Sequence, residues 1–287
     1  MAKFLLTTDN TCDLPRELLE EAGVAMLSLS YTIGGETHDL SNEMDPHEFY
    51  ERMRGGEMPT TAQVNPGQAE EFFRDRLREH DTILHLAFSS GLSGTWQSAE
   101  IAARTVMEGM PGKKVYVVDT LAASMGEGLM VHYAMKLRDE GATAGEAAAW
   151  LEEHKQNFVH LFTVDDLNHL YRGGRVSRAT ALLGTMLSMK PVLHVDDAGH
   201  LVALGKVRGR KNSLINLVDR MAELIPGHEN DVVFISHGDC LADAEFVRDE
   251  IRKRFGMESF LINMIGATIG AHSGPGTVAL FFLGEHR

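Results

Sequence analysis

Cysteine and tryptophan are scarce in this sequence, which has two of each among 287 residues. Cys12 and Cys240 are far apart, and neither belongs to a CxxC or similar metal-ligand spacing. These facts argue against a disulfide framework and against a structural zinc site. The chain also lacks an HExxH motif and an acidic calcium loop, so we predict no metal.

Positive charge is also in short supply. Lys and Arg number 27 against 41 Asp and Glu, which gives a formal net charge of −14. This balance excludes nucleic acid as the main partner and argues against stable adsorption to an anionic membrane, while transient contact with a membrane surface stays open. The apolar run that opens the chain is too short for a signal peptide, and we expect a cytoplasmic protein.

One long segment, Ser259–Gly284, has no acidic residue, lysine or arginine, but it does not resemble a membrane helix. Four glycines and Pro275 interrupt it, and it contains His272. Its two apolar halves predict two buried strands around a Gly/Pro-rich turn.

Strand and helix patterns alternate through the first half of the chain, which predicts a mostly parallel sheet with helices on both faces. The expected buried parallel strands are Phe4–Leu6, Ile83–Phe88, Val115–Val118 and Val159–Val164, and the expected helices are Gln68–Arg78, Trp96–Met107 and Ala144–Glu153.

The second half predicts a smaller α/β domain with a mixed sheet. It begins with a hairpin around DDAGH, and three strands and two helices follow. The expected elements are strands Pro191–Val195, Leu201–Val207, Val232–Ser236, Phe260–Ile265 and Thr277–Leu283, with helices Ser213–Leu224 and Ala244–Phe255. We therefore expect two α/β domains, residues 1–160 and 161–287.

The run SSGLSGT, Ser89–Thr95, is the most informative local pattern. It follows an apolar strand and precedes a helix, so its unpaired backbone N–H groups suit an anion. Ser93, between Gly91 and Gly94, is the best-placed donor. The alternative is that Ser89 and Ser93 only form a turn and a helix cap. The run is neither a Walker loop nor a GxGxxG fingerprint.

Two further segments offer polar groups. PTTAQVNP, Pro59–Pro66, holds Thr61, although the pattern also suits a plain capping loop before a helix. HSGPG, His272–Gly276, places a histidine beside a constrained turn, where it could donate to an anion. Since the chain has 14 histidines, a structural role for His272 is the alternative.

Cations gather in two segments, GGRVSR with Arg175 and KVRGRK with Arg208 and Arg210. They could face a phosphate or an acidic partner surface, or they could protect a solvated edge strand. Ser93 and His272 together also suggest a serine hydrolase or acyltransferase, but the chain has no GxSxG elbow.

Taken in order, TDNTCDLP, PTTAQ, SSGLSGT, VDT, GGRVS and HSGPG give the chain a resemblance to the DegV family over essentially its whole length. The family includes the FakB-type fatty-acid-binding subunits of bacterial fatty acid kinase. The resemblance implies a non-catalytic protein that holds one long-chain fatty acid in an apolar tunnel between or beneath its two domains. A separate FakA-type kinase would phosphorylate the carboxylate to an acyl phosphate for phospholipid synthesis.

By the same resemblance, Thr61, Ser93 and His272 would contact the carboxylate. Arg175 would act near phosphoryl transfer, while Arg208 would face the kinase. Its charge and its place in the same basic segment put Arg210 on that face too. No catalytic residue and no cofactor beyond the bound fatty acid is implied. The chain reads TAQV where the family commonly has TSQP, and HSGPG replaces HTGPG. The sequence gives neither the preferred chain length and unsaturation nor the oligomeric state.

Overall fold

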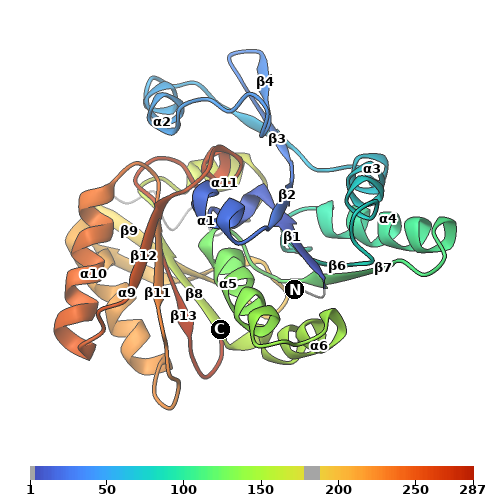
Figure 1. Cartoon of the computed structure of the whole chain (residues 1–287). Coiled ribbons are helices and arrows are strands. Elements are labelled where there is room, and N and C mark those ends of the chain that lie inside the picture. Colours follow the sequence, from blue (N-terminus) through green and yellow to red (C-terminus); the bar gives the residue numbers. More distant parts are fainter. Residues whose placement is uncertain (1–3, 178–187) are drawn as a thin grey trace.

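The structure is a computed structural model that describes residues 4–177 and 188–287. Two sheets dominate it, one built from the N-terminal part of the chain and one from the C-terminal part, with helix α5 (Met125–Asp139) between them (Figure 1). The expected α/β architecture, with a parallel sheet and a separate mixed sheet, is confirmed.

The first sheet is parallel and has the strand order β2-β1-β6-β7 within the described residues. Successive residues of its strands face opposite sides, so Leu5 packs in one apolar cluster and Leu6 in another. Helices α3 and α4 cover the first side, and α5 and α6 cover the second. The strands are β1 (Leu5–Asp9), β2 (Ala25–Leu27), β6 (Thr82–Ala87) and β7 (Lys114–Asp119), and the helices besides α5 are α3 (Pro66–Arg76), α4 (Thr95–Gly109) and α6 (Ala144–His154).

The second sheet is mixed and has the order β10-β9-β8-β13-β11-β12. Its strands are β8 (Phe158–Thr163), β9 (Met189–Val195), β10 (Leu201–Arg208), β11 (Val233–His237), β12 (Phe260–Met264) and β13 (Val278–Leu283). Helices α9 (Arg210–Leu224) and α10 (Leu241–Phe255) cover its outer face (Figure 1). The predicted hairpin is confirmed as the antiparallel pair β9–β10.

The assignment of Val159–Val164 to the parallel sheet is wrong. This run forms β8, which pairs antiparallel with β13 and β9 in the mixed sheet. A strand buried on both faces has the same apolar composition in either sheet, so its composition does not reveal its partners. Among the described residues the mixed sheet therefore has six strands and the parallel sheet four, and the mixed sheet is not the smaller one.

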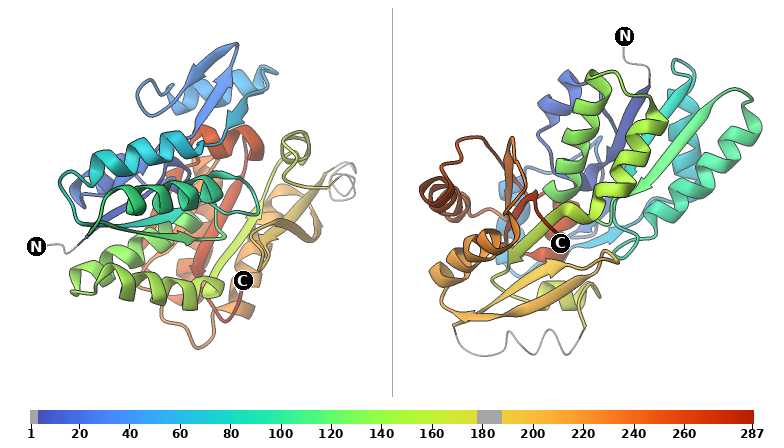
Figure 2. Two further views of the ribbon diagram at one scale, coloured as in Figure 1. Left: turned by 90° about the vertical axis from the view of Figure 1, so that its right-hand side faces the viewer. Right: turned by 90° about the horizontal axis from the view of Figure 1, so that it is seen from below.

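A third, small sheet was not expected from the sequence. It joins β3 (Ser30–Ile33), β4 (Glu36–His38) and β5 (Thr60–Ala62) in the order β4-β3-β5. Helix α2 (Pro46–Arg54) packs with it, and Figure 2 (left) shows this unit above the short helix α11 (Ala267–Ser273). β3, β5 and α2 of this unit contact α11.

The long uncharged segment folds as two strands, β12 and β13, as predicted. The short helix α11 precedes the Gly/Pro-rich turn, so His272 lies in the last turn of that helix and not in the loop itself. Among the described residues no helix has the length and apolar character needed to cross a bilayer. The other α-helices in the described part of the chain are α1 (Arg16–Glu21) and α7 (Asn168–Arg172).

Candidate functional site

A largely apolar cavity lies between the loops of the parallel sheet, the inner face of the mixed sheet and α11. It contains about 800 Å³ of space free of atoms, part of it open to solvent. Its apolar walls include Phe88, Leu92, Phe162, Leu201, Ile269 and Phe281. Four of the six residues proposed from the sequence also line it, namely Thr61, Ser93, Arg175 and His272.

The loop 89–94 runs from the end of β6 to the start of α4, as predicted. The Ser89 hydroxyl is buried, donates to the carbonyl of Gly199 over 2.9 Å and accepts from the Gly91 N–H. A Cβ on Gly91 would lie 2.6 Å from the Ala198 carbonyl oxygen, so only glycine permits this close approach of the β9–β10 turn. Ser89 therefore fixes the loop.

Ser93 both contacts the first residue of α4 and lines the cavity. Its Oγ accepts from the Thr95 N–H over 3.2 Å and lies 2.9 Å from Thr95 Oγ1, so it helps to start α4. It is also part of the cavity wall. A hydroxyl held beside a helix N-terminus is suited to an anionic group.

Thr61 and His272 come from different elements and meet at the cavity. Thr61 Oγ1 on β5 lies 2.7 Å from His272 Nε2 on α11. The neighbouring Gln63 side chain accepts from the Gly94 N–H over 3.1 Å, which ties this segment to the loop that carries Ser93. The predicted capping role of the segment is also present, because Asn65 and Gln68 form a capping box at the start of α3.

His272 is held as a neutral imidazole. Burial, assisted by the positive charge of Arg175, lowers its pKa to about 4. Its Nδ1 is buried without a hydrogen-bond partner in the described chain, and Gly173 packs so close that a Cβ there would clash with this nitrogen. At neutral pH Thr61 and His272 therefore offer a hydroxyl and an imidazole group without a net charge.

Arg175 supplies the positive charge of the site. Its Nε donates to the Leu92 carbonyl over 3.2 Å, and a second guanidinium N–H donates to the Gly173 carbonyl. The side chain is half-buried, and burial lowers its pKa. These contacts link the segment after α7 to the loop that carries Ser93.

A second pocket of about 710 Å³ adjoins the cavity and shares Thr61, Arg175 and His272 with it. Its other walls include the cationic side chain of Arg172 and the exposed Met58. Thr61, Arg175 and His272 thus lie between the largely apolar cavity and a less apolar pocket whose wall includes two arginines. Gln63 lies within PTTAQVNP and Arg172 directly precedes GGRVSR, but neither pattern predicts these two side chains as site residues.

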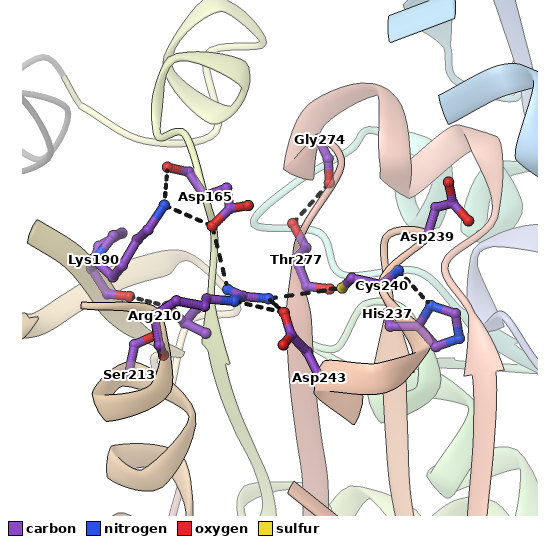
Figure 3. Close-up of polar contacts among 12 residues, drawn as sticks. Asp165, Lys190, Arg210, Ser213, His237, Asp239, Cys240, Asp243, Gly274 and Thr277 are labelled. Carbon is purple, nitrogen blue, oxygen red and sulfur yellow. Dashed lines mark hydrogen bonds and ion pairs between the residues drawn. The ribbon is translucent and has the colours of Figure 1, made fainter. Parts of the chain in front are cut away.

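Arg208 and Arg210 lie elsewhere. Arg208 is exposed at the end of β10. Arg210 begins α9 and is engaged by acidic groups, with Nε donating to Asp243 over 2.8 Å and Nη1 at 3.7 Å from Asp165, which also binds Lys190 (Figure 3). Neither arginine lines the cavity.

The described residues do not place Ser93 and His272 as a nucleophile and its base. Within the described residues, His272 Nε2 contacts Thr61 and not Ser93, while no acidic side chain binds Nδ1 to orient the ring. Both thiols are buried or half-buried, and burial raises the pKa of Cys240 to about 12. In the same residues no three His, Cys, Asp or Glu side chains converge as a metal site would require.

Comparisons with known proteins agree on one family. The family model described as "Uncharacterised protein, DegV family" matches residues 3–285. A DegV domain-containing protein of Clostridium perfringens is 40% identical over all of this chain and 99% of its own length.

Solved structures extend the agreement to the fold. A DegV family protein from Thermus thermophilus, described by its fatty acid binding, has a TM-score of 0.89 at 34% identity, covering 98% of this chain and 99% of its own. The fatty-acid-binding DegV protein of Bacillus subtilis has a TM-score of 0.85 at 29% identity, covering 99% and 100%. On the family model and the curated relative, this chain belongs to the DegV family.

Proposed function

We propose that this protein binds one long-chain fatty acid in the apolar cavity, with the carboxylate at Thr61, Ser93 and His272. The observation that carries the proposal is the contrast within one cavity. Its walls are largely apolar, yet Thr61, Ser93, His272 and Arg175 line it together, with Thr61 Oγ1 2.7 Å from His272 Nε2. The fatty-acid-binding descriptions of the Thermus and Bacillus proteins support it.

The energetics suit such a ligand. Each buried CH₂ contributes about 0.8 kcal/mol, so an acyl tail supplies most of the binding free energy. The carboxylate then needs donors that replace water, and Arg175 supplies a compensating charge because His272 is neutral. The acyl tail therefore supplies most of the affinity, and the polar side chains around the carboxylate orient the fatty acid in the cavity.

Substitution of single donors tests the placement of the carboxylate. Thr61→Val and Ser93→Ala each remove one hydrogen bond to a charged group, worth about 1.5–3 kcal/mol, so affinity for oleate is expected to fall roughly 10- to 150-fold. Thr60→Val is the matched control, since Thr60 is exposed on the same strand and does not line the cavity. Equal affinities in all three variants would contradict the placement.

We further propose that the bound carboxylate is presented to a separate kinase, which converts it to an acyl phosphate. The adjoining pocket supports this step, since it shares Thr61, Arg175 and His272 with the cavity and adds Arg172. A phosphoryl group that arrives there would meet two guanidinium groups next to the carboxylate. The exposed Arg208 is the candidate for docking, while the ion-paired Arg210 has less free charge to offer a partner.

Charge reversal separates docking from transfer. Arg208→Glu should weaken kinase binding most at low salt. The defect should shrink as added salt screens the attraction in the wild-type complex, and bound fatty acid should be unchanged. Arg175→Gln should lower acyl-phosphate formation even at saturating kinase. Lys253→Glu, on the exposed face of α10, is the control of equal charge change. Normal phosphorylation with both arginine variants would refute the presentation step.

A further inference from the structure

His160 is a buried polar side chain that the proposed carboxylate site does not use. It lies in the middle of β8, is 1% exposed and lines the cavity. Neither of its ring nitrogens has a hydrogen-bond partner among the described residues. Leaving such a group unpaired costs free energy, so an apolar residue would be the better wall for a plain hydrocarbon tail.

The imidazole is fixed in position by its neighbours. It faces Phe281 edge-on at 5.6 Å between ring centroids, and a Cβ on Gly126 of α5 would lie 2.6 Å from Nε2. Only glycine at position 126 leaves room for the ring. The imidazole of His160 therefore packs between Gly126 of α5 and Phe281 on the inner face of the mixed sheet.

His160 is also separated from the carboxylate site. It pairs with Phe281 on β13, three residues beyond Val278, which follows the turn next to His272. At about 3.4 Å per residue, this places His160 about 10 Å further along the strand. Among the described residues of the wall, Ser273 has a buried hydroxyl without a hydrogen-bond partner, but it adjoins His272 on α11.

The ring is neutral. Burial, then the charges of Arg287 and His194, lower its pKa well below the ordinary value. A neutral imidazole has one N–H donor and one acceptor nitrogen, and both are unused here. An alcohol can satisfy either nitrogen, whereas a carboxylate can only accept and is already expected at Thr61 and Ser93.

We propose that His160 is a second recognition point of the cavity, which selects fatty acids that carry a hydroxyl group within the acyl chain. The inference rests on the proposed fatty acid binding and specifies the ligand class. A site built to pair with a hydroxyl discriminates against the analogue that lacks it, because the buried polar group is then left unsatisfied.

The test measures affinities of delipidated protein for octadecanoic acid and for a panel of monohydroxy octadecanoic acids that differ in hydroxyl position. One mid-chain isomer is expected to bind wild-type protein roughly 2- to 12-fold more tightly than the plain acid. His160→Leu should reverse that order, and His160→Gln should partly retain it. His194→Leu, on the adjacent strand and outside the cavity wall, should behave like wild type.

The outcomes are distinguishable. If no acid of the panel binds, the proposed function fails. If the plain acid binds but every hydroxylated isomer is equally disfavoured in wild type and in His160→Leu, the inference fails, and a trapped water is then the partner of His160. Circular dichroism of each variant checks that it is folded. If His160→Leu does not fold, the comparison of wild type with His160→Gln still tests the inference.

Discussion

The neutral state of His272 leads to a measurable dependence of stability on pH. We consider the replacement His272→Gln in delipidated protein. Gln keeps a hydrogen-bonding group near Thr61 but cannot titrate. Because burial and Arg175 lower the pKa of His272 to about 4, the folded protein resists a proton that the unfolded chain accepts near pH 6.5.

The sign and size follow from this difference. As pH falls through 6.5 the unfolded state gains a proton first, so wild type loses stability relative to His272→Gln until the folded protein is also protonated near pH 4. At about 1.4 kcal/mol per pH unit, the full loss is about 3 kcal/mol. A bound carboxylate favours the protonated imidazole, so the loss should be smaller in protein loaded with fatty acid.

Urea unfolding at a series of pH values between 7 and 4, followed by tryptophan fluorescence, measures the free energy of unfolding of each protein. Other titrating groups are common to wild type and variant and cancel in the difference. His200→Gln is the control, since the His200 side chain is 58% exposed and does not line the cavity. A difference between wild type and His272→Gln that is constant over this pH range would refute the reasoning.

Substitutions at Gly173, Asp13 and Asn65 test separate features of the structure. Gly173→Ala should weaken fatty acid binding without any change in donors, because the new methyl group would displace His272, whereas Gly205→Ala has open space and should bind normally in the same titration. Asp13→Asn should be stabilising at pH 7 by up to about 4 kcal/mol and close to neutral at pH 4 in urea unfolding, because burial raises the pKa of Asp13 to about 7 and the buried carboxylate is costly once ionised. Asn65→Ala should lower the free energy of unfolding by about 1 kcal/mol through loss of the capping box, with unchanged binding; a loss of binding would show that the cap also positions Thr61.

Patterns of neighbouring residues predict those parts of the site whose contacts are made within one short segment of the chain. The loop 89–94 was recognisable because glycine and serine follow an apolar strand and precede a helix, which are adjacent in the chain. The capping residues before α3 were recognisable for the same reason.

Features that depend on distant partners could not be predicted. The pairing of β8 with β13 joins segments more than a hundred residues apart, and a run buried on both faces fits either sheet. The strands β3, β4 and β5 have only three or four residues each, too few for a periodic pattern.

The partners of Arg210 were equally hidden. Asp243 and Asp165 approach it only because α9, α10 and the end of β8 converge in the fold (Figure 3). A count of cations in the segment from Lys206 to Lys211 cannot distinguish this paired arginine from the exposed Arg208.

The most direct test of the central claim is organic extraction of the purified, folded protein, followed by mass spectrometry and quantification against protein concentration. We predict about one fatty acid per chain, lost after delipidation and restored by added oleate. The absence of any fatty acid in the extract, together with no binding of added oleate or palmitate to folded protein, would contradict the account.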